Sequence, residues 1–200
     1  MAEREPAYQR LATDERRRRL LALGAELFAR HTYAELSMAA IAREAGISKA
    51  LLYHYFPSKQ AYFVATLEQQ AAELARLVDV DPALPPVEQL TRALDAFLGW
   101  VEANAEGYGK LLQGATTHVE VRELVDGVRD ATAQRILAGL APGGPPTPAL
   151  RAAVHGWLWF MDGVLMDWIA HRDLPRQELL GLLLGTLLGA VAASGAALPS

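Results

Sequence analysis

The 200-residue sequence contains no cysteine. This absence excludes disulfide frameworks, thiolate metal sites and cysteine nucleophiles, and it is compatible with the reducing cytoplasm in which we expect the protein. Charged residues are 21% and hydrophobic residues 52% of the chain, a balance that excludes a disordered charged tail and allows a sizeable core. The first ten residues are charged and lack an apolar run, so we expect no secretory signal.

The sequence also lacks the Val, Ile and Thr alternation that is typical of strands, and it has no repeat of solenoid length. Helical periodicity runs through it instead. We predict an all-α fold of about nine helices, interrupted by the proline-containing stretches 79–86 and 141–148. The expected helices run from an N-cap at Thr13 to about residue 31, and then over residues 38–45, 49–55, 59–78, 86–104, 106–113, 118–140, 149–171 and 175–196.

Charge is divided unevenly along the chain. Residues 1–59 carry ten Lys and Arg against seven Asp and Glu, a net charge of +3, whereas the remaining residues carry nine against sixteen, a net charge of −7. A basic end on an acidic body indicates that one end meets a polyanion and the other does not.

Residues 37–59, SMAAIAREAGISKALLYHYFPSK, have the pattern of a helix-turn-helix. Ser37 and Ser48 are expected to cap two short helices, and Gly46 between them tolerates a left-handed backbone. Small Ala42 lets the two helices cross closely. The second helix then presents polar side chains to DNA bases and phosphates. The predicted DNA-binding residues are Ser37, Ser48, Lys49, Ala50, Leu51, Tyr53, His54, Tyr55 and Lys59.

Such a segment is alternatively an ordinary part of a helical core, with its tyrosines as core aromatics. However, the strings ELFARHTY, S-x3-IA-x3-GIS and LYHYFPSKQAYF, within residues 13–67, resemble the tetracycline-repressor (TetR) family of bacterial regulators. One departure is Ala50-Leu51, where members often carry Gly-Thr, so we expect Leu51 to touch a thymine methyl group instead of offering a hydroxyl. The resemblance implies a three-helix DNA-binding domain over residues 1–58 and an effector-binding and dimerisation domain over residues 59–200.

Small residues recur at helical spacing in the last two expected helices. They would let helix backbones approach closely in a bundle formed with the same pair from a second subunit. The resemblance implies the same homodimer, and the alternative is that these residues pack inside one subunit. The predicted interface residues are Ala152, Gly156, Gly163, Gly181, Gly185 and Gly189.

The uncharged stretch from residue 179 onward is long enough to span a bilayer. It lacks flanking aromatic belts and a cluster of basic anchors, so we expect no membrane partner.

Aromatic and acidic side chains gather in the helix that follows the second breaker. The resemblance places the family's ligand chamber in this domain. We predict an apolar, aromatic-lined cavity whose acids, chiefly Asp162, favour a cationic or hydrogen-bonding effector. The predicted lining residues are Phe97, Trp100, Tyr108, His155, Trp159, Asp162 and Met166.

The prediction is therefore a homodimeric regulator, a repressor released from a palindromic operator by a small apolar or aromatic effector, with no cofactor and no metal site. One alternative keeps the DNA-binding module and replaces the effector with a protein partner. Another is a helical enzyme that pairs His155 with Asp162, or His118 with Glu120. No HExxH, GxSxG or glycine-rich phosphate loop supports the enzyme.

Overall fold

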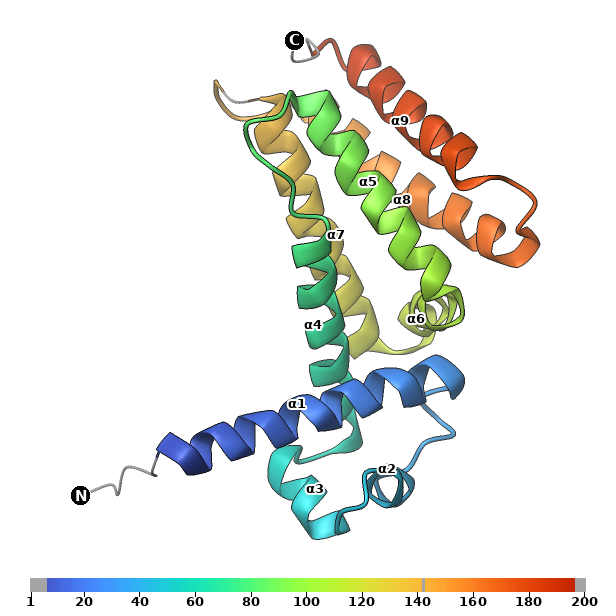
Figure 1. Ribbon diagram of the computed structural model, residues 1–200. Helices are drawn as coiled ribbons and strands as arrows, with labels where there is room; N and C mark the ends of the chain where they lie inside the picture. Colours follow the sequence, from blue (N-terminus) through green and yellow to red (C-terminus); the bar gives the residue numbers. More distant parts are fainter. Residues whose placement is uncertain (1–6, 142, 197–200) are drawn as a thin grey trace. The chain divides into compact units, whose positions relative to one another are not determined.

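The computed structural model describes residues 7–141 and 143–196, and the regular structure in these ranges is entirely helical (Figure 1). The all-α prediction and the expected number of helices are confirmed for this part of the chain. Its nine helices are α1 (Ala7–Arg30), α2 (Met38–Glu44), α3 (Lys49–Tyr55), α4 (Lys59–Leu77), α5 (Pro86–Ala103), α6 (Ala105–Thr117), α7 (Val119–Leu140), α8 (Pro148–His171) and α9 (Arg176–Ala193).

Two helices are longer than the sequence predicted. Helix α1 begins at Ala7, so the N-cap prediction for Thr13 is wrong, since Thr13 lies inside the helix. The preceding residues, AYQRLA, include strong helix formers that continue the helix toward the N-terminus. Helix α6 runs to Thr117 instead of residue 113. It continues through Gly114, and Ala115 in the extra turn is buried.

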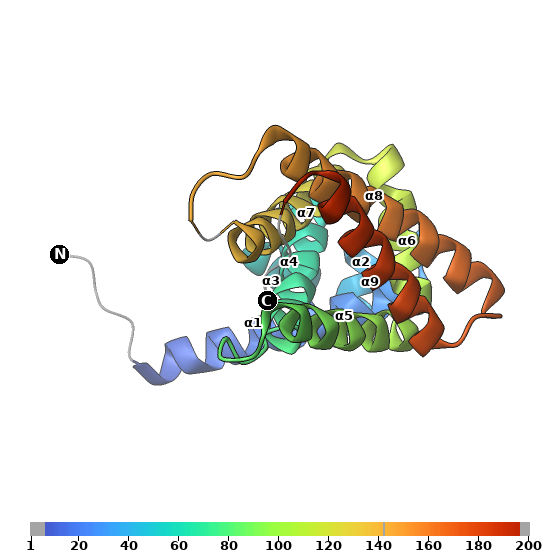
Figure 2. The same cartoon turned by 90° about the horizontal axis from the view of Figure 1, so that it is seen from above.

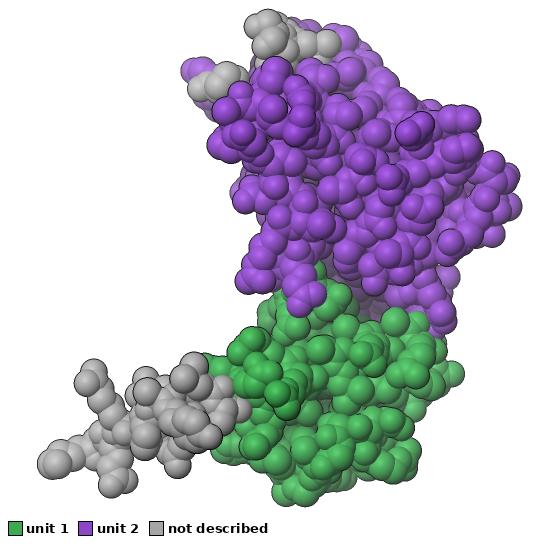
Figure 3. All heavy atoms as spheres, viewed as in Figure 1, with its two compact units in different colours: residues 1–71 green, residues 72–200 purple. Residues whose placement is uncertain are grey.

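The chain forms two compact units, Met1–Ala71 and Ala72–Ser200, called unit 1 and unit 2 below (Figure 3). The division falls within α4, whereas the sequence analysis set it after residue 58. The first half of α4 belongs to unit 1 because Tyr62 and Ala65 are buried in the same apolar cluster as the side chains of α1.

The core of unit 1 joins α1 to the two short helices. Leu52 of α3 and Ile41 of α2 are completely buried, and the α1 side chains of Leu20, Leu21, Leu27 and Phe28 are buried with them. The two N-cap predictions are confirmed, since the Ser37 hydroxyl accepts from the Ala40 N–H and the Ser48 hydroxyl from the Leu51 N–H, each at 3.1 Å. Gly46 has the left-handed φ of +64° that the turn between α2 and α3 requires.

Helices α1 and α4 approach each other closely at Gly24. A methyl group at this position would lie 2.5 Å from the Thr66 Oγ1 and 2.8 Å from the Tyr62 hydroxyl oxygen. That hydroxyl donates a 2.6 Å hydrogen bond to the Leu20 carbonyl of α1. Burial raises the pKa of the Tyr62 hydroxyl, which keeps it a neutral donor.

Unit 2 is a helical bundle in which α7 packs on α6 and α8, and α9 packs on α8 and α5 (Figure 2). One face of α9 is fully buried through Leu179, Leu183, Leu187 and Val191. The Trp157 indole N–H of α8 donates to the Leu183 carbonyl of α9 at 2.9 Å. This bond fixes the register of α8 and α9, the two helices on which dimerisation was predicted.

We expect Gly24→Ala to lower the free energy of unfolding by about 1–3 kcal/mol, because the added methyl group overpacks the α1–α4 contact. Gly127→Ala is the control, since nothing lies within 4 Å of a methyl group at that helical position. That variant should gain up to about 1 kcal/mol from helix propensity. Urea denaturation followed by circular dichroism measures both, and a Gly24→Ala protein as stable as wild type would contradict the close contact.

Candidate DNA-binding and effector sites

Helix α3 buries Leu52 and exposes the side chains on its outer face. Ser48, Lys49, Ala50, Tyr53 and His54 are exposed, and the Tyr53 side chain is 41% accessible. The Lys49 ammonium lies 5.7 Å from the centroid of the Tyr53 ring, as expected for residues four apart on one helical face. The structure therefore brings five of the predicted DNA-binding residues together on one solvent-facing surface.

The other predicted residues are placed differently. Ser37 is exposed at the start of α2, and Leu51 is half-buried. Tyr55 is also half-buried and packs against the apolar cluster of unit 1, with its ring centroid 6.4 Å from that of Phe56. Tyr55 thus supports the position of α3 from its inner side.

Lys59 has a structural role that the sequence analysis did not anticipate. Its ammonium donates to the carbonyls of Tyr33 and Leu36, at 2.9 and 3.0 Å, and lies 4.2 Å from the centroid of the Tyr33 ring. Two of its three N–H donors are therefore bound to the loop between α1 and α2. This arrangement ties that loop to the first turn of α4 and leaves at most one donor for a phosphate.

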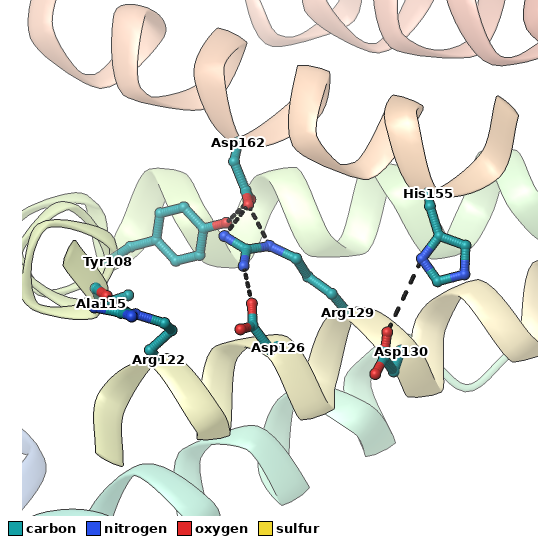
Figure 4. Close-up of polar contacts among 8 residues, drawn as sticks. All are labelled: Tyr108, Ala115, Arg122, Asp126, Arg129, Asp130, His155 and Asp162. Atoms are coloured by element: carbon teal, nitrogen blue, oxygen red, sulfur yellow. Dashed lines mark hydrogen bonds and ion pairs between the residues drawn. The ribbon is translucent and has the colours of Figure 1, made fainter. Parts of the chain in front are cut away.

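A buried polar cluster lies in unit 2 at the meeting of three helices (Figure 4). Asp162 of α8 accepts hydrogen bonds from the Tyr108 hydroxyl of α6, at 3.3 Å, and from the Arg129 Nε of α7, at 2.7 Å. The Arg129 Nη1 also pairs with Asp126 at 2.6 Å. The side chains of Arg129 and Asp162 are only 15% and 14% exposed.

The charge of Asp162 is compensated within this cluster. Because Arg129 neutralises the carboxylate, the structure removes the reason for expecting a cationic effector and leaves the hydrogen-bonding one. Burial, together with the neighbouring Asp162 carboxylate, raises the pKa of the Tyr108 hydroxyl, so the hydroxyl stays a proton donor. Arg129 was missed by the sequence analysis, although it makes the strongest contact that Asp162 has.

The predicted effector residues form two groups beside this cluster. Phe97 and Trp100 of α5 pack edge-on against the Tyr108 ring, with centroids 6.0 and 6.1 Å away. The second group shares one face of α8, where the spacing of His155, Trp159, Asp162 and Met166 follows the helical period. Trp159 is 62% exposed, and the Arg129 guanidinium lies over its ring at 4.1 Å.

A cleft of about 270 Å³ opens between α7 and α8. It is lined by Asp126, Arg129, Asp130, His155, Leu158 and Trp159, and therefore includes two of the predicted effector residues. A second cleft, of about 320 Å³, lies beside residues 172–176 and was not anticipated. The other five predicted lining residues, Phe97, Trp100, Tyr108, Asp162 and Met166, line neither of these two clefts. Among the side chains that the structure describes, no group of three His, Asp or Glu is arranged to hold a metal ion.

The small residues of α8 and α9 lie on the open side of unit 2. All six predicted interface residues are exposed, and a methyl group at any of the five glycines would meet nothing within 4 Å. The alternative that they pack inside one subunit is therefore wrong. Exposed Phe160 and Leu182 accompany them. Among the described residues, α9 alone is long and apolar enough to cross a membrane, by length and composition only, and 22% of it is buried.

Comparison with known proteins identifies relatives of both units. The profile of the family "Bacterial regulatory proteins, tetR family" matches residues 20–66, and that of the "Tetracyclin repressor-like, C-terminal domain" matches residues 86–189. The transcriptional activator FasR of Mycolicibacterium smegmatis is 35% identical over 103 residues, which are 50% of this chain and 46% of FasR. The chain thus spans about half of that relative.

Two further relatives match over most of the chain. MftR of Mycobacterium tuberculosis, a candidate transcriptional regulator of mycofactocin biosynthesis, is 28% identical over 78% of this chain and 81% of its own. The crystal structure of a tetR-family transcriptional regulator from Streptomyces coelicolor superposes with a TM-score of 0.80 and 30% identity. It covers 91% of this chain and 82% of that protein.

We expect Lys59→Met to lower the free energy of unfolding by about 2 kcal/mol, because the carbonyls of Tyr33 and Leu36 lose a charged donor. Lys49→Met is the matched control, since that side chain is exposed and should leave stability within about 0.5 kcal/mol of wild type. Urea denaturation measures both. Equal stability of the two variants would show that Lys59 does not hold the loop.

Proposed function

The chain belongs to the tetR family of bacterial regulatory proteins, and from this premise we propose that it is a homodimeric transcriptional regulator acting in the cytoplasm. It binds a palindromic operator through α2 and α3 and leaves it when a small effector binds unit 2. The observation that carries the proposal is the exposed polar face of α3, a helix that begins at the Ser48 cap and follows the Ser37-capped helix α2.

Helix α3 enters the major groove in this proposal. Lys49, in the first turn of α3, reaches a base edge or a phosphate, and the Tyr53 hydroxyl donates to a phosphate oxygen. The Ser37 and Ser48 hydroxyls accept from the backbone and keep their own O–H free to donate to DNA. In a two-fold dimer the half-sites lie about 34–36 Å apart, or a multiple of that distance.

The open faces of α8 and α9 form the proposed dimer interface. Their glycines allow close approach of backbones from a second subunit, and Phe160 and Leu182 supply apolar area that is exposed in the single chain. A four-helix arrangement of two α8–α9 pairs would cover the side of α9 that the subunit leaves open.

The effector is proposed to bind where α6, α7 and α8 meet. The 3.3 Å contact between Tyr108 and Asp162 is long for an O–H···O bond, so a polar group of a ligand competes with it on favourable terms. The adjoining aromatic side chains accommodate the ligand's apolar part. Helix α4 runs from unit 1 into unit 2 and would transmit the change. The effector lowers DNA affinity only by its differential affinity for the two conformations.

Repression is the proposed outcome of operator binding, although FasR is named as an activator. The position of the operator relative to the promoter sets this sign, and the chemistry of binding is the same in both cases.

The first experiment selects bound duplexes from a random DNA library with the purified protein at physiological ionic strength. We expect a palindrome, to which Tyr53→Ala binds at least tenfold more weakly because a phosphate contact is lost in each subunit. Val128→Ala, whose side chain is equally exposed at 41% but lies on α7, should bind as wild type. Recovery of no common sequence by a folded dimer would overturn the proposal.

Substitution at the open face of α9 tests the dimer. Gly185→Leu should weaken dimerisation at least tenfold, because the side chain fits the open single subunit but not a close helix contact. Gly127→Leu on α7 adds the same side chain at an equally open position and should leave the dimer intact. Analytical ultracentrifugation measures both, and dimers of equal strength would exclude this interface.

Once the operator is known, effectors are found as small molecules that release it. Trp159→Ala and Asp162→Asn should each raise the effector concentration for half-release at least tenfold, while operator affinity without effector stays within about twofold. Val128→Ala again serves as the control. Unchanged responses of both variants would place the effector elsewhere.

A further inference from the structure

Helix α1 extends well beyond the core on which it packs. From Thr13 on, the first buried side chain is that of Leu20, and none of residues 13–19 is buried. At 1.5 Å per residue, the stretch 7–19, called the overhang below, is a helix about 20 Å long. Figures 1 and 2 show this half of α1 extending past α3 within unit 1. Core packing therefore does not explain the helical turns of α1 formed by residues 13–19.

The overhang carries four consecutive arginines, Arg16 to Arg19, after Asp14 and Glu15. Arg18 pairs with Glu15 at 2.7 Å and Arg19 pairs with the same carboxylate at 2.9 Å. Both arginine side chains remain 69% and 78% exposed. One carboxylate shared by two guanidinium groups leaves a surplus of positive charge, and such exposed pairs are weak enough for another anion to displace.

Arg17 places this charge beside the DNA-reading helix. Its guanidinium lies 5.5 Å from the centroid of the Phe56 ring, and Phe56 is the C-cap of α3. Arg17 lies three and four residues before the buried Leu20 and Leu21, so it shares their helical face beyond the end of the core, and there it is exposed. The arginines of the overhang therefore lie next to the C-terminal end of α3, where Arg17 contacts Phe56.

From these observations we infer that the overhang is a second DNA contact, which binds the phosphates of the duplex flanking the half-site that α3 reads. The inference rests on the proposed function, because it needs α3 on DNA. Arginine contacts to phosphates carry no base information, so the flank is bound whatever its sequence. Glu15 limits this contact, since its carboxylate holds Arg18 and Arg19 and itself repels the phosphates.

The test compares the selected palindrome as a short duplex with the same palindrome carrying ten arbitrary base pairs on each side. Wild-type protein should bind the long duplex at least tenfold more tightly. Arg17→Gln removes one phosphate contact per subunit, and at about 0.9 per phosphate the slope of log K against log salt should fall by about 2 per dimer on the long duplex only.

Glu15→Gln supplies a test with the opposite sign. It should bind the long duplex more tightly than wild type and with a steeper salt dependence, an effect that partial unfolding does not produce. Arg30→Gln is the matched control, because Arg30 is an exposed arginine at the other end of α1 and hydrogen-bonds the Glu26 carbonyl. It should bind both duplexes as wild type does.

The outcomes separate the two proposals. A palindrome bound equally with and without flanks, or Glu15→Gln that binds the long duplex no better than wild type, overturns the overhang contact alone. Failure to select any sequence overturns the proposed function, and the overhang contact with it.

Discussion

The close approach of α1 and α4 at Gly24 determines the geometry of unit 1. Tyr62 and Thr66 fill the space that any side chain at position 24 would occupy, and the Tyr62 hydroxyl bonds the Leu20 carbonyl across the contact. One turn earlier on α4, Lys59 holds the carbonyls of the loop that leads into α2. The start of α4 therefore sets where α2 begins, and α3 follows α2 through a turn that needs Gly46.

Unit 2 is organised by a polar constraint in addition to its apolar core. Arg129 joins α7 to α8 through Asp162, and Tyr108 adds α6 to the same carboxylate. A steric contact such as that at Gly24 cannot be replaced by a ligand. Hydrogen bonds between polar groups can be, because a ligand can offer its own polar groups to the same partners. This difference agrees with the proposed roles of the two units: DNA binding by unit 1 and effector binding by unit 2.

The sequence was sufficient where the deciding interaction is local. The serine caps of α2 and α3, the Gly46 turn and the small-residue faces of α8 and α9 all follow from spacings of a few residues, and the structure has them. Contacts between distant residues were not predictable in this way. Lys59 finds its carbonyls 23 and 26 residues away, and Arg129 lies 33 residues from Asp162. The length of α1 was missed because the expected cap at Thr13 competes with helix formers before it.

The pairing of Arg129 with Asp162 also restricts how the bundle can misassemble. A shift of α7 against α8 by one helical turn, about 5.4 Å, would change which apolar side chains meet. The same shift would separate Arg129 from Asp162; Arg129 would keep Asp126 of its own helix, but the Asp162 carboxylate, only 14% exposed, would lose its cationic partner. The contacts of Asp162 with Arg129 and Tyr108 therefore favour the native register of α7 against α8.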